Sequence, residues 1–304
     1  MGTFIAILLG TILGGLAIAT EHGAAIVSAG VVACAVLGYG FSRTVPALPA
    51  QAPDLRVEWN PITPTWRIFQ FTRQTRSIFL SVLGISWFWF FGACLMAMFP
   101  AYCKDVLLGN EHVATFLLAL FSIGIAVGSL LCERLSRGHL ELGLVPFGSI
   151  GMTLFTADLF LAGSPYHGAL PATAVGVLDF LHHAGAWRIT LDLLFLAVFS
   201  GFYIVPLNTL IQQRTEPAHR SRVIAGNNII NAFFMVLASV FLIGMQSTGA
   251  TPTQIFLVVA LMNLISALYI YTLIPEFLYR FMCWIAVNLI LSLIHISEPT
   301  RPER

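Results

Sequence analysis

Three asparagines stand inside long apolar stretches of this sequence, where each amide must find a hydrogen-bond partner. Asn208 follows Pro206 in the stretch GFYIVPLNTLIQQR, and Asn227 and Asn231 stand four residues apart, on one face of any helix. The proline frees a backbone carbonyl and permits a kink. Neutral amides suit a substrate that carries both charges and hydroxyls, and they equally suit hydrogen bonds between helices. We predict that Asn208, Asn227 and Asn231 bind substrate.

Asp158 is the fourth residue that we predict to bind substrate. It lies inside the apolar stretch GMTLFTADLFLAG, where an acidic side chain is costly and by default indicates function, although the nearby end of the stretch also allows it to reach interfacial water. It could take up a proton or meet a cationic headgroup amine. Asp192 has a simpler interpretation, because Arg188 stands four residues before it and can pair with it along one helix.

A short charged motif, GSLLCERLSRG, begins at Gly128. It combines a glycine with an acid and basic residues, so that Glu133 can pair with Arg134 or Arg137 and hold one side of the protein closed in one state. We predict that Gly128, Glu133, Arg134 and Arg137 form a gate. Ordinary charge at the end of a membrane helix is the alternative interpretation.

The sequence shows no arrangement typical of catalysis or of metal binding. It has no Ser-His-Asp, Cys-His, phosphate-loop or paired-carboxylate pattern, its five cysteines show no CxxC spacing, and the His182-His183 pair has no further ligands nearby. We therefore predict no catalytic residue, no metal and no cofactor. Fifteen Lys and Arg against fourteen Asp and Glu leave no basic field, which argues against a nucleic-acid partner.

The composition identifies the elements that must position these residues. The chain of 304 residues is 58% hydrophobic and 10% charged, whereas soluble domains are about a quarter charged. Because backbone polar groups inside a bilayer must be bonded within their own segment, long apolar stretches must be helices. We predict an all-α polytopic membrane protein with eight transmembrane helices, near residues 3–20, 24–42, 77–100, 113–132, 142–163, 189–211, 224–246 and 254–274.

The basic residues predict the orientation of these helices. Of the thirteen Lys and Arg residues before residue 291, all except Lys104 and Arg188 fall in the loops of one side. The positive-inside rule places that side in the cytoplasm, and an even number of spans then places both ends of the chain there.

The spacing of the spans predicts the domain organisation. Two spans in residues 1–42 precede a long loop, 43–76, and six spans follow in residues 77–275, with a juxtamembrane segment beginning at 276–290. This layout is typical of major facilitator transporters, which are built as two six-helix bundles. On this interpretation the chain is a fragment with a partial major facilitator fold, in which residues 1–42 are the last two helices of the N-terminal bundle, 43–76 is the cytoplasmic linker and the first four helices are absent.

Three stretches resemble a known family. YIVPLNTLIQQR from Tyr203 and EPAHRSRVIAGNN from Glu216 resemble the lysophospholipid transporter branch of the major facilitator superfamily, in the form fused to a glycerophospholipid acyltransferase. LIPEFLYR from Leu273 resembles the junction to that acyltransferase. The resemblance covers most of residues 1–288. It implies movement of lysophospholipid across or into the inner leaflet of the bacterial inner membrane, with membrane lipids and a fused or associated acyltransferase as partners. The acyltransferase motif itself is absent, so no enzyme activity is implied for this chain.

Two other functions fit the same residues, namely a non-transporting membrane platform for a fused acyltransferase and a drug-efflux member of the superfamily. The final stretch, residues 291–304, begins LSLIHISEPTR and resembles the translation of a sequencing-library adapter. We expect this tail to be non-native and assign no chemistry to it.

Overall fold

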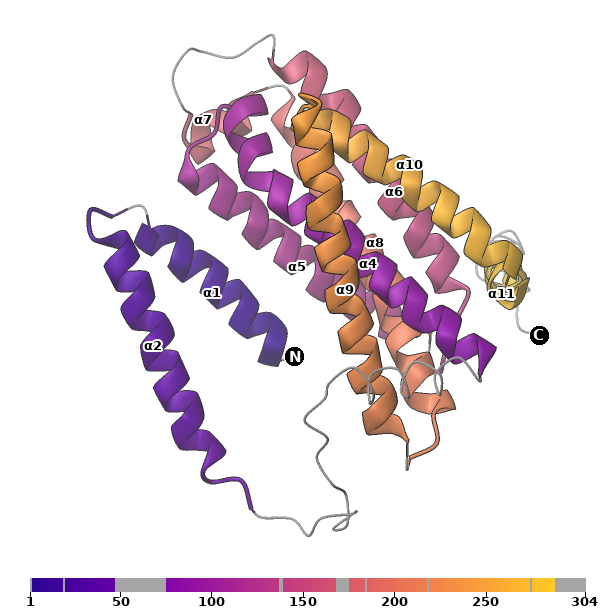
Figure 1. Ribbon diagram of the computed structural model, residues 1–304. Helices are drawn as coiled ribbons and strands as arrows, with labels where there is room; N and C mark the ends of the chain where they lie inside the picture. Colours follow the sequence, from indigo (N-terminus) through magenta and orange to yellow (C-terminus); the bar gives the residue numbers. More distant parts are fainter. Residues whose placement is uncertain are drawn as a thin grey trace, which may run out of the picture.

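The chain folds into a bundle of helices (Figure 1). The computed structural model describes residues 2–18, 20–46, 75–136, 139–167, 175–183, 185–217, 219–273 and 275–287. Its elements are α1 (Gly2–Ile18), α2 (Gly23–Ser42), α4 (Arg76–Ala101), the π-helix η1 (Tyr102–Val106), α5 (Glu111–Leu135), α6 (Leu144–His167), α7 (Val177–His182), α8 (Ala186–Arg214), α9 (Arg220–Ser247), α10 (Pro252–Leu273) and α11 (Pro275–Ile285). Apart from one isolated bridge between Gly109 and Val175, these residues contain no β-structure. The predicted all-α class is confirmed.

Each apolar segment that we predicted to span the membrane coincides with one helix, and seven of the described helices are long and apolar enough to do so. The shorter one is α1, with 17 residues, which ends before the predicted limit at residue 20. Thr20 Oγ1 donates to the carbonyl of Ala17 over 2.7 Å. A Cβ atom at Gly23 would lie 2.5 Å from the carbonyl oxygen of Ile18. This hydroxyl bond and the tight turn between α1 and α2 explain the early end.

The central helix is α8, which packs between α5 and α6. Small residues permit both contacts, because they let helix backbones approach closely. On the α5 side, a Cβ at Gly201 would lie 2.7 Å from the carbonyl carbon of Gly128. On the α6 side, a Cβ at Gly148 would lie 2.6 Å from the backbone nitrogen of Tyr203. Larger residues at these glycines would push the helices apart.

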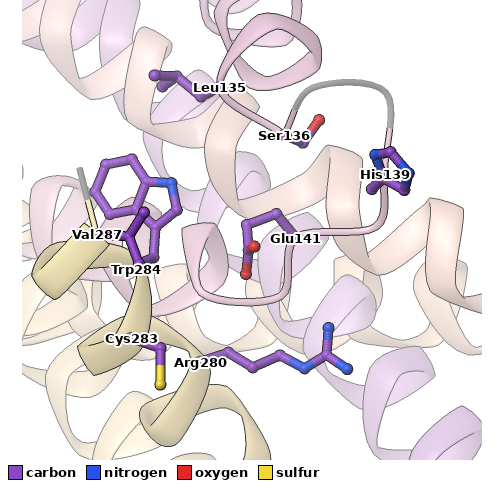
Figure 2. A pocket seen from close by; sticks show the side chains of 8 residues that line it. All are labelled: Leu135, Ser136, His139, Glu141, Arg280, Cys283, Trp284 and Val287. Atoms are coloured by element: carbon purple, nitrogen blue, oxygen red, sulfur yellow. The ribbon is translucent and has the colours of Figure 1, made fainter.

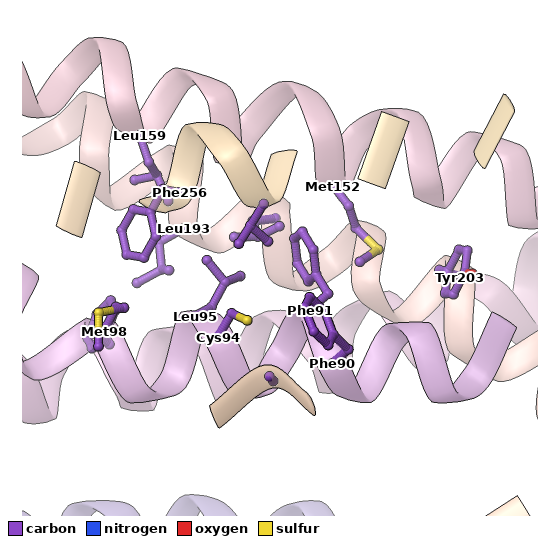
Figure 3. Close-up of a cluster of buried hydrophobic side chains, with 14 of the residues drawn as sticks. Phe90, Phe91, Cys94, Leu95, Met98, Met152, Leu159, Leu193, Tyr203 and Phe256 are labelled. Carbon is purple, nitrogen blue, oxygen red and sulfur yellow. The ribbon is translucent and has the colours of Figure 1, made fainter. Parts of the chain in front are cut away.

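The main core fills the space between α4, α6, α8 and α10 (Figure 3). Phe91 and Leu95 on α4 meet Met152 on α6, Leu193 on α8 and Phe256 on α10, and none of these side chains is more than 3% exposed. In a lipid environment such contacts stabilise mainly through close packing, because the surrounding lipid is as apolar as the core. The core therefore holds α4 and α10 against the central helices.

The first two helices lie to one side of the six-helix bundle, which is formed by α4, α5, α6, α8, α9 and α10 (Figure 1). α1 packs against α5, where a Cβ at Gly15 would overlap the side chain of Thr115. α2 packs against α1, and Gly23 is its one buried residue. Residues 47–74 of the predicted linker lie outside the described part of the chain, so the predicted domain boundaries stay predictions.

Two short helices were not predicted, because a search for span-length segments does not find them. α7 lies between α6 and α8, and α11 occupies most of the segment predicted as juxtamembrane. Phe277 of α11 is 2% exposed and packs inward, whereas Leu278, Tyr279 and Met282 are exposed. α11 is therefore an amphipathic helix with one face on the bundle and another apolar face outside it.

Candidate substrate cleft

An apolar cleft of about 560 Å³ opens between α4, α5, α8 and α9. Most of its wall is aromatic or aliphatic, including Phe88 and Trp89 of α4 and Phe121 of α5. Its polar lining residues are Ser129, Ser200, Asn208 and Thr209, and no charged side chain lines it. A largely apolar concavity of this size with a few polar groups is typical of small-molecule sites.

The polar groups of the cleft direct their donors back into their own helices. Asn208 Nδ2 donates to the Ile204 carbonyl over 3.0 Å, and Thr209 Oγ1 donates to the Val205 carbonyl over 2.9 Å. Ser129 and Ser200 do the same, each over 2.8 Å. Because the donors are used, the cleft offers a bound molecule the lone pairs of the amide and hydroxyl oxygens. The site suits a ligand with an apolar body and a group that donates hydrogen bonds.

The structure separates Asn227 and Asn231 from Asn208. Neither lines the cleft, and both are buried on α9. Asn231 Oδ1 accepts a 2.8 Å bond from Ser86 Oγ, which joins α9 to α4. Asn227 Oδ1 has no hydrogen-bond partner among the described residues. Asn231 thus connects helices, while Asn227, one turn earlier, keeps an unused acceptor.

Asp158 also lies outside the cleft, in an ion pair between α6 and α8. Arg188 Nε lies 3.0 Å from Asp158 Oδ2, and Arg188 Nη2 lies 2.5 Å from Asp158 Oδ1. The predicted pairing of Arg188 with Asp192 is therefore wrong. The guanidinium can form two parallel bonds with a carboxylate on the facing helix, whereas Asp192 is buried, with 5% exposure.

The predicted gate does not form one cluster in the described residues. Gly128 lies at the crossing of α5 and α8, where a Cβ would overlap the carbonyl of Val198. Glu133 and Arg134 are exposed at the end of α5, and no ion pair joins Glu133 to another described residue. Arg137 lies outside the described residues. Gly128 therefore has an observed packing role, and the gate stays a prediction.

Sequence reasoning missed a polar network beside the cleft. Trp87 Nε1 donates to Asn263 Oδ1 over 2.8 Å, and Asn263 Nδ2 donates to Thr153 Oγ1 over 2.9 Å and to the Ser149 carbonyl over 3.2 Å. This network ties α4, which carries the aromatic wall, to α6 and α10. The signal that could have found it is the one used for the other asparagines, because Asn263 is a lone amide in an apolar span.

A second pocket, of about 350 Å³, lies where α11 covers the loop between α5 and α6 (Figure 2). Glu141 comes from the loop, whereas Arg280 and Trp284 come from α11 (Figure 2). Arg280 contacts Glu276 over 3.2 Å and the Leu140 carbonyl over 3.4 Å. These contacts fasten α11 to the bundle.

The helices and the cleft define the class of this chain as a polytopic, all-helical membrane protein with an apolar cavity between its spans. Among curated proteins it is 28% identical over 223 residues to the lysophospholipid transporter LplT of Enterobacter sp. (strain 638), a match that covers 70% of this chain and 48% of that protein. It is 29% identical over 242 residues to the lysophospholipid transporter LplT of Escherichia coli O1:K1 / APEC, covering 75% of this chain and 51% of that protein.

The chain spans about half the length of the curated relatives it matches. These relatives support the resemblance to the lysophospholipid transporter branch. No protein-family model matches the chain. No solved structure matches it.

Proposed function

We propose that this chain is part of a lysophospholipid transporter of the bacterial inner membrane, which moves lysophospholipid across the bilayer or into its inner leaflet. The observation that carries the proposal is the similarity, over 70% to 75% of the chain, to proteins named as lysophospholipid transporters. The cleft beside Asn208 supports it, because a lysophospholipid combines one acyl chain with a polar headgroup.

The chemistry of the cleft suits the two ends of such a lipid. The acyl chain would lie along the aromatic and aliphatic wall, where Met96 and Met235 can adapt to chains of different shape. The Asn208 amide oxygen would accept a hydrogen bond from a hydroxyl or ammonium group of the headgroup. Asn227 would offer a second acceptor, because its Oδ1 is unused among the described residues.

The proposed transporter uses the predicted organisation. Residues 1–42 would complete the N-terminal bundle, 77–275 would form the C-terminal bundle, and both ends would lie in the cytoplasm. α1 against α5 would then be a contact between the bundles, and Gly15 permits it because a side chain there would meet Thr115. Glu133, Arg134 and Arg137 would close the cytoplasmic side near this contact.

The experiment is uptake of radiolabelled lysophosphatidylethanolamine into spheroplasts that contain the natural full-length protein. We expect Asn208→Leu to reduce uptake about tenfold, because it removes the acceptor and leaves the donor's hydrogen bond unmade. Asn228→Leu is the matched control, because Asn228 is exposed on α9, and we expect it to transport normally. Normal uptake by the Asn208 variant would remove Asn208 from the site.

The same assay separates the proposal from the platform. Any fused acyltransferase is deleted, and uptake by the remaining membrane part is measured. A transporter keeps moving lipid, whereas a platform does not. Absence of lysolipid uptake together with drug resistance in an efflux-deficient strain would indicate an efflux protein instead.

A further inference from the structure

Three charged side chains form a cluster at one end of α6 and α8, apart from the cleft. Asp158 comes from α6, and Arg188 and Asp192 come from α8. Arg188 binds both oxygens of the Asp158 carboxylate through two of its nitrogens. This forked pair matches one positive charge with one negative charge.

Asp192 is a second carboxyl group with no cation of its own. Its side chain is buried, and its Oδ2 has no hydrogen-bond partner among the described residues. A side-chain hydrogen bond joins it to Asp158. Ionised carboxylates only accept hydrogen bonds, so a bond between two carboxyl groups requires a proton on one of them. Without that proton the cluster would also carry an uncompensated negative charge inside an apolar bundle, which is costly.

We propose that Asp158 and Asp192 share a proton, so that these two residues and Arg188 form a proton-binding site between α6 and α8. In the protonated form the Asp192 carboxyl donates to the Asp158 carboxylate, which stays bound to Arg188, and the cluster is neutral. On release, the O–H bond of Asp192 breaks and the proton passes to water. Two carboxylates then compete for one guanidinium, and the contact between α6 and α8 changes.

The cluster is open on one side, as a site that exchanges protons must be. The side chains of Arg188 and Asp158 are 50% and 32% exposed, whereas Asp192 lies behind them. The charged groups that act on Asp192 are Asp158 and Arg188. The neighbouring elements η1, α5 and α7 carry further titratable side chains, and each of these is exposed: Lys104, Asp105, Glu111, His112, Asp179 and His182.

The test is infrared spectroscopy of the full chain, purified in a detergent without carbonyl groups. At pH about 7, ordinary Asp and Glu side chains are ionised, since their pKa values are near 4. A carbonyl stretch of a protonated carboxylic acid that persists at this pH and shifts in D₂O therefore reports the shared proton. We expect the natural chain to show this band. Its absence would overturn the proposal.

Three variants assign the band. Asp192→Asn mimics the protonated form and should fold, and we expect it to lose the band. Asp158→Asn frees Arg188 to pair with Asp192, which then ionises, so the band should again be lost. Asp179→Asn is the control, because Asp179 is exposed on α7, and should keep the band. A band that survives in either cluster variant, or that disappears in the control, would contradict a proton shared by Asp158 and Asp192. Circular dichroism confirms that each variant is helical. The spectrum does not depend on transport, so this test can fail while the proposed function stands.

Discussion

Asn263 joins three helices through one amide group, and this makes it the residue on which we expect the bundle to depend most. Its side chain is 1% exposed and bonds to Trp87, Thr153 and the Ser149 carbonyl. Asn263→Leu keeps the volume but leaves the indole N–H of Trp87 without its acceptor. We expect the free energy of unfolding to fall by about 1 to 3 kcal/mol.

The measurement for Asn263 is thermal unfolding of the detergent-solubilised protein. Asn228→Leu makes the same chemical change at an exposed position of α9, and its melting temperature should match that of the natural chain. Equal melting temperatures for the two variants would show that the network contributes nothing to stability.

The residue-scale predictions depended on one signal, a polar side chain in an apolar span, and this signal identifies a residue without its partner. It placed Asn208 in the cleft. It also selected Asn231, which bonds to Ser86, and Asp158, which bonds to Arg188. The i, i+4 spacing of Asn227 and Asn231 correctly places them on one face of α9, but which helix that face meets depends on tertiary packing. The same limit led to the wrong partner for Arg188.

At the scale of elements, the crossing of α5 and α8 depends on glycines. Gly124 and Gly128 stand four residues apart on α5 and face α8, where a Cβ at Gly124 would lie 2.6 Å from the Cβ of Ala197. We expect Gly128→Ala to destabilise the protein by about 1 to 3 kcal/mol, because the added methyl group meets backbone that cannot move aside easily.

A matched variant separates this packing effect from helix propensity. A Cβ at Gly244 of α9 has no atom within 4 Å, so Gly244→Ala should be neutral or slightly stabilising. Thermal unfolding of both variants makes the comparison. If Gly128→Ala melts no lower than Gly244→Ala, the close contact at Gly128 is not required for stability.

The spans themselves were predicted well, because hydrocarbon thickness and backbone hydrogen bonding leave few alternatives for a long apolar segment. The ends were predicted less well. α5 begins at Glu111 because the Asn110 side chain accepts bonds from the backbone nitrogens of His112 and Val113, over 3.1 and 3.2 Å. Apolarity does not report such a capping bond. The amphipathic helix α11 escaped prediction for a related reason, since its apolar residues alternate with polar ones at helical spacing.

At the scale of the whole molecule, the open question is how the first two helices meet the six-helix bundle. The sequence predicts that they belong to another bundle, but it cannot say which face they contact. In the structure α1 lies along α5, and α2 lies beyond α1 (Figure 1). The close approach of Gly15 to Thr115 makes this arrangement testable.

We expect Gly15→Cys and Thr115→Cys to form a disulfide in membranes that contain the natural full-length protein without its own cysteines. The two backbones are close enough for the short Cβ separation that a disulfide requires, about 3.5 to 4.5 Å, after a small adjustment. Val36→Cys with Thr115→Cys is the control pair, because Val36 is 64% exposed on α2. After mild oxidation, mass spectrometry of the digested protein should find the linked peptides for the first pair alone. Linkage of the control pair, or of neither pair, would mean that α1 does not rest on α5 in the membrane, and the proposed contact between the bundles would have to lie elsewhere.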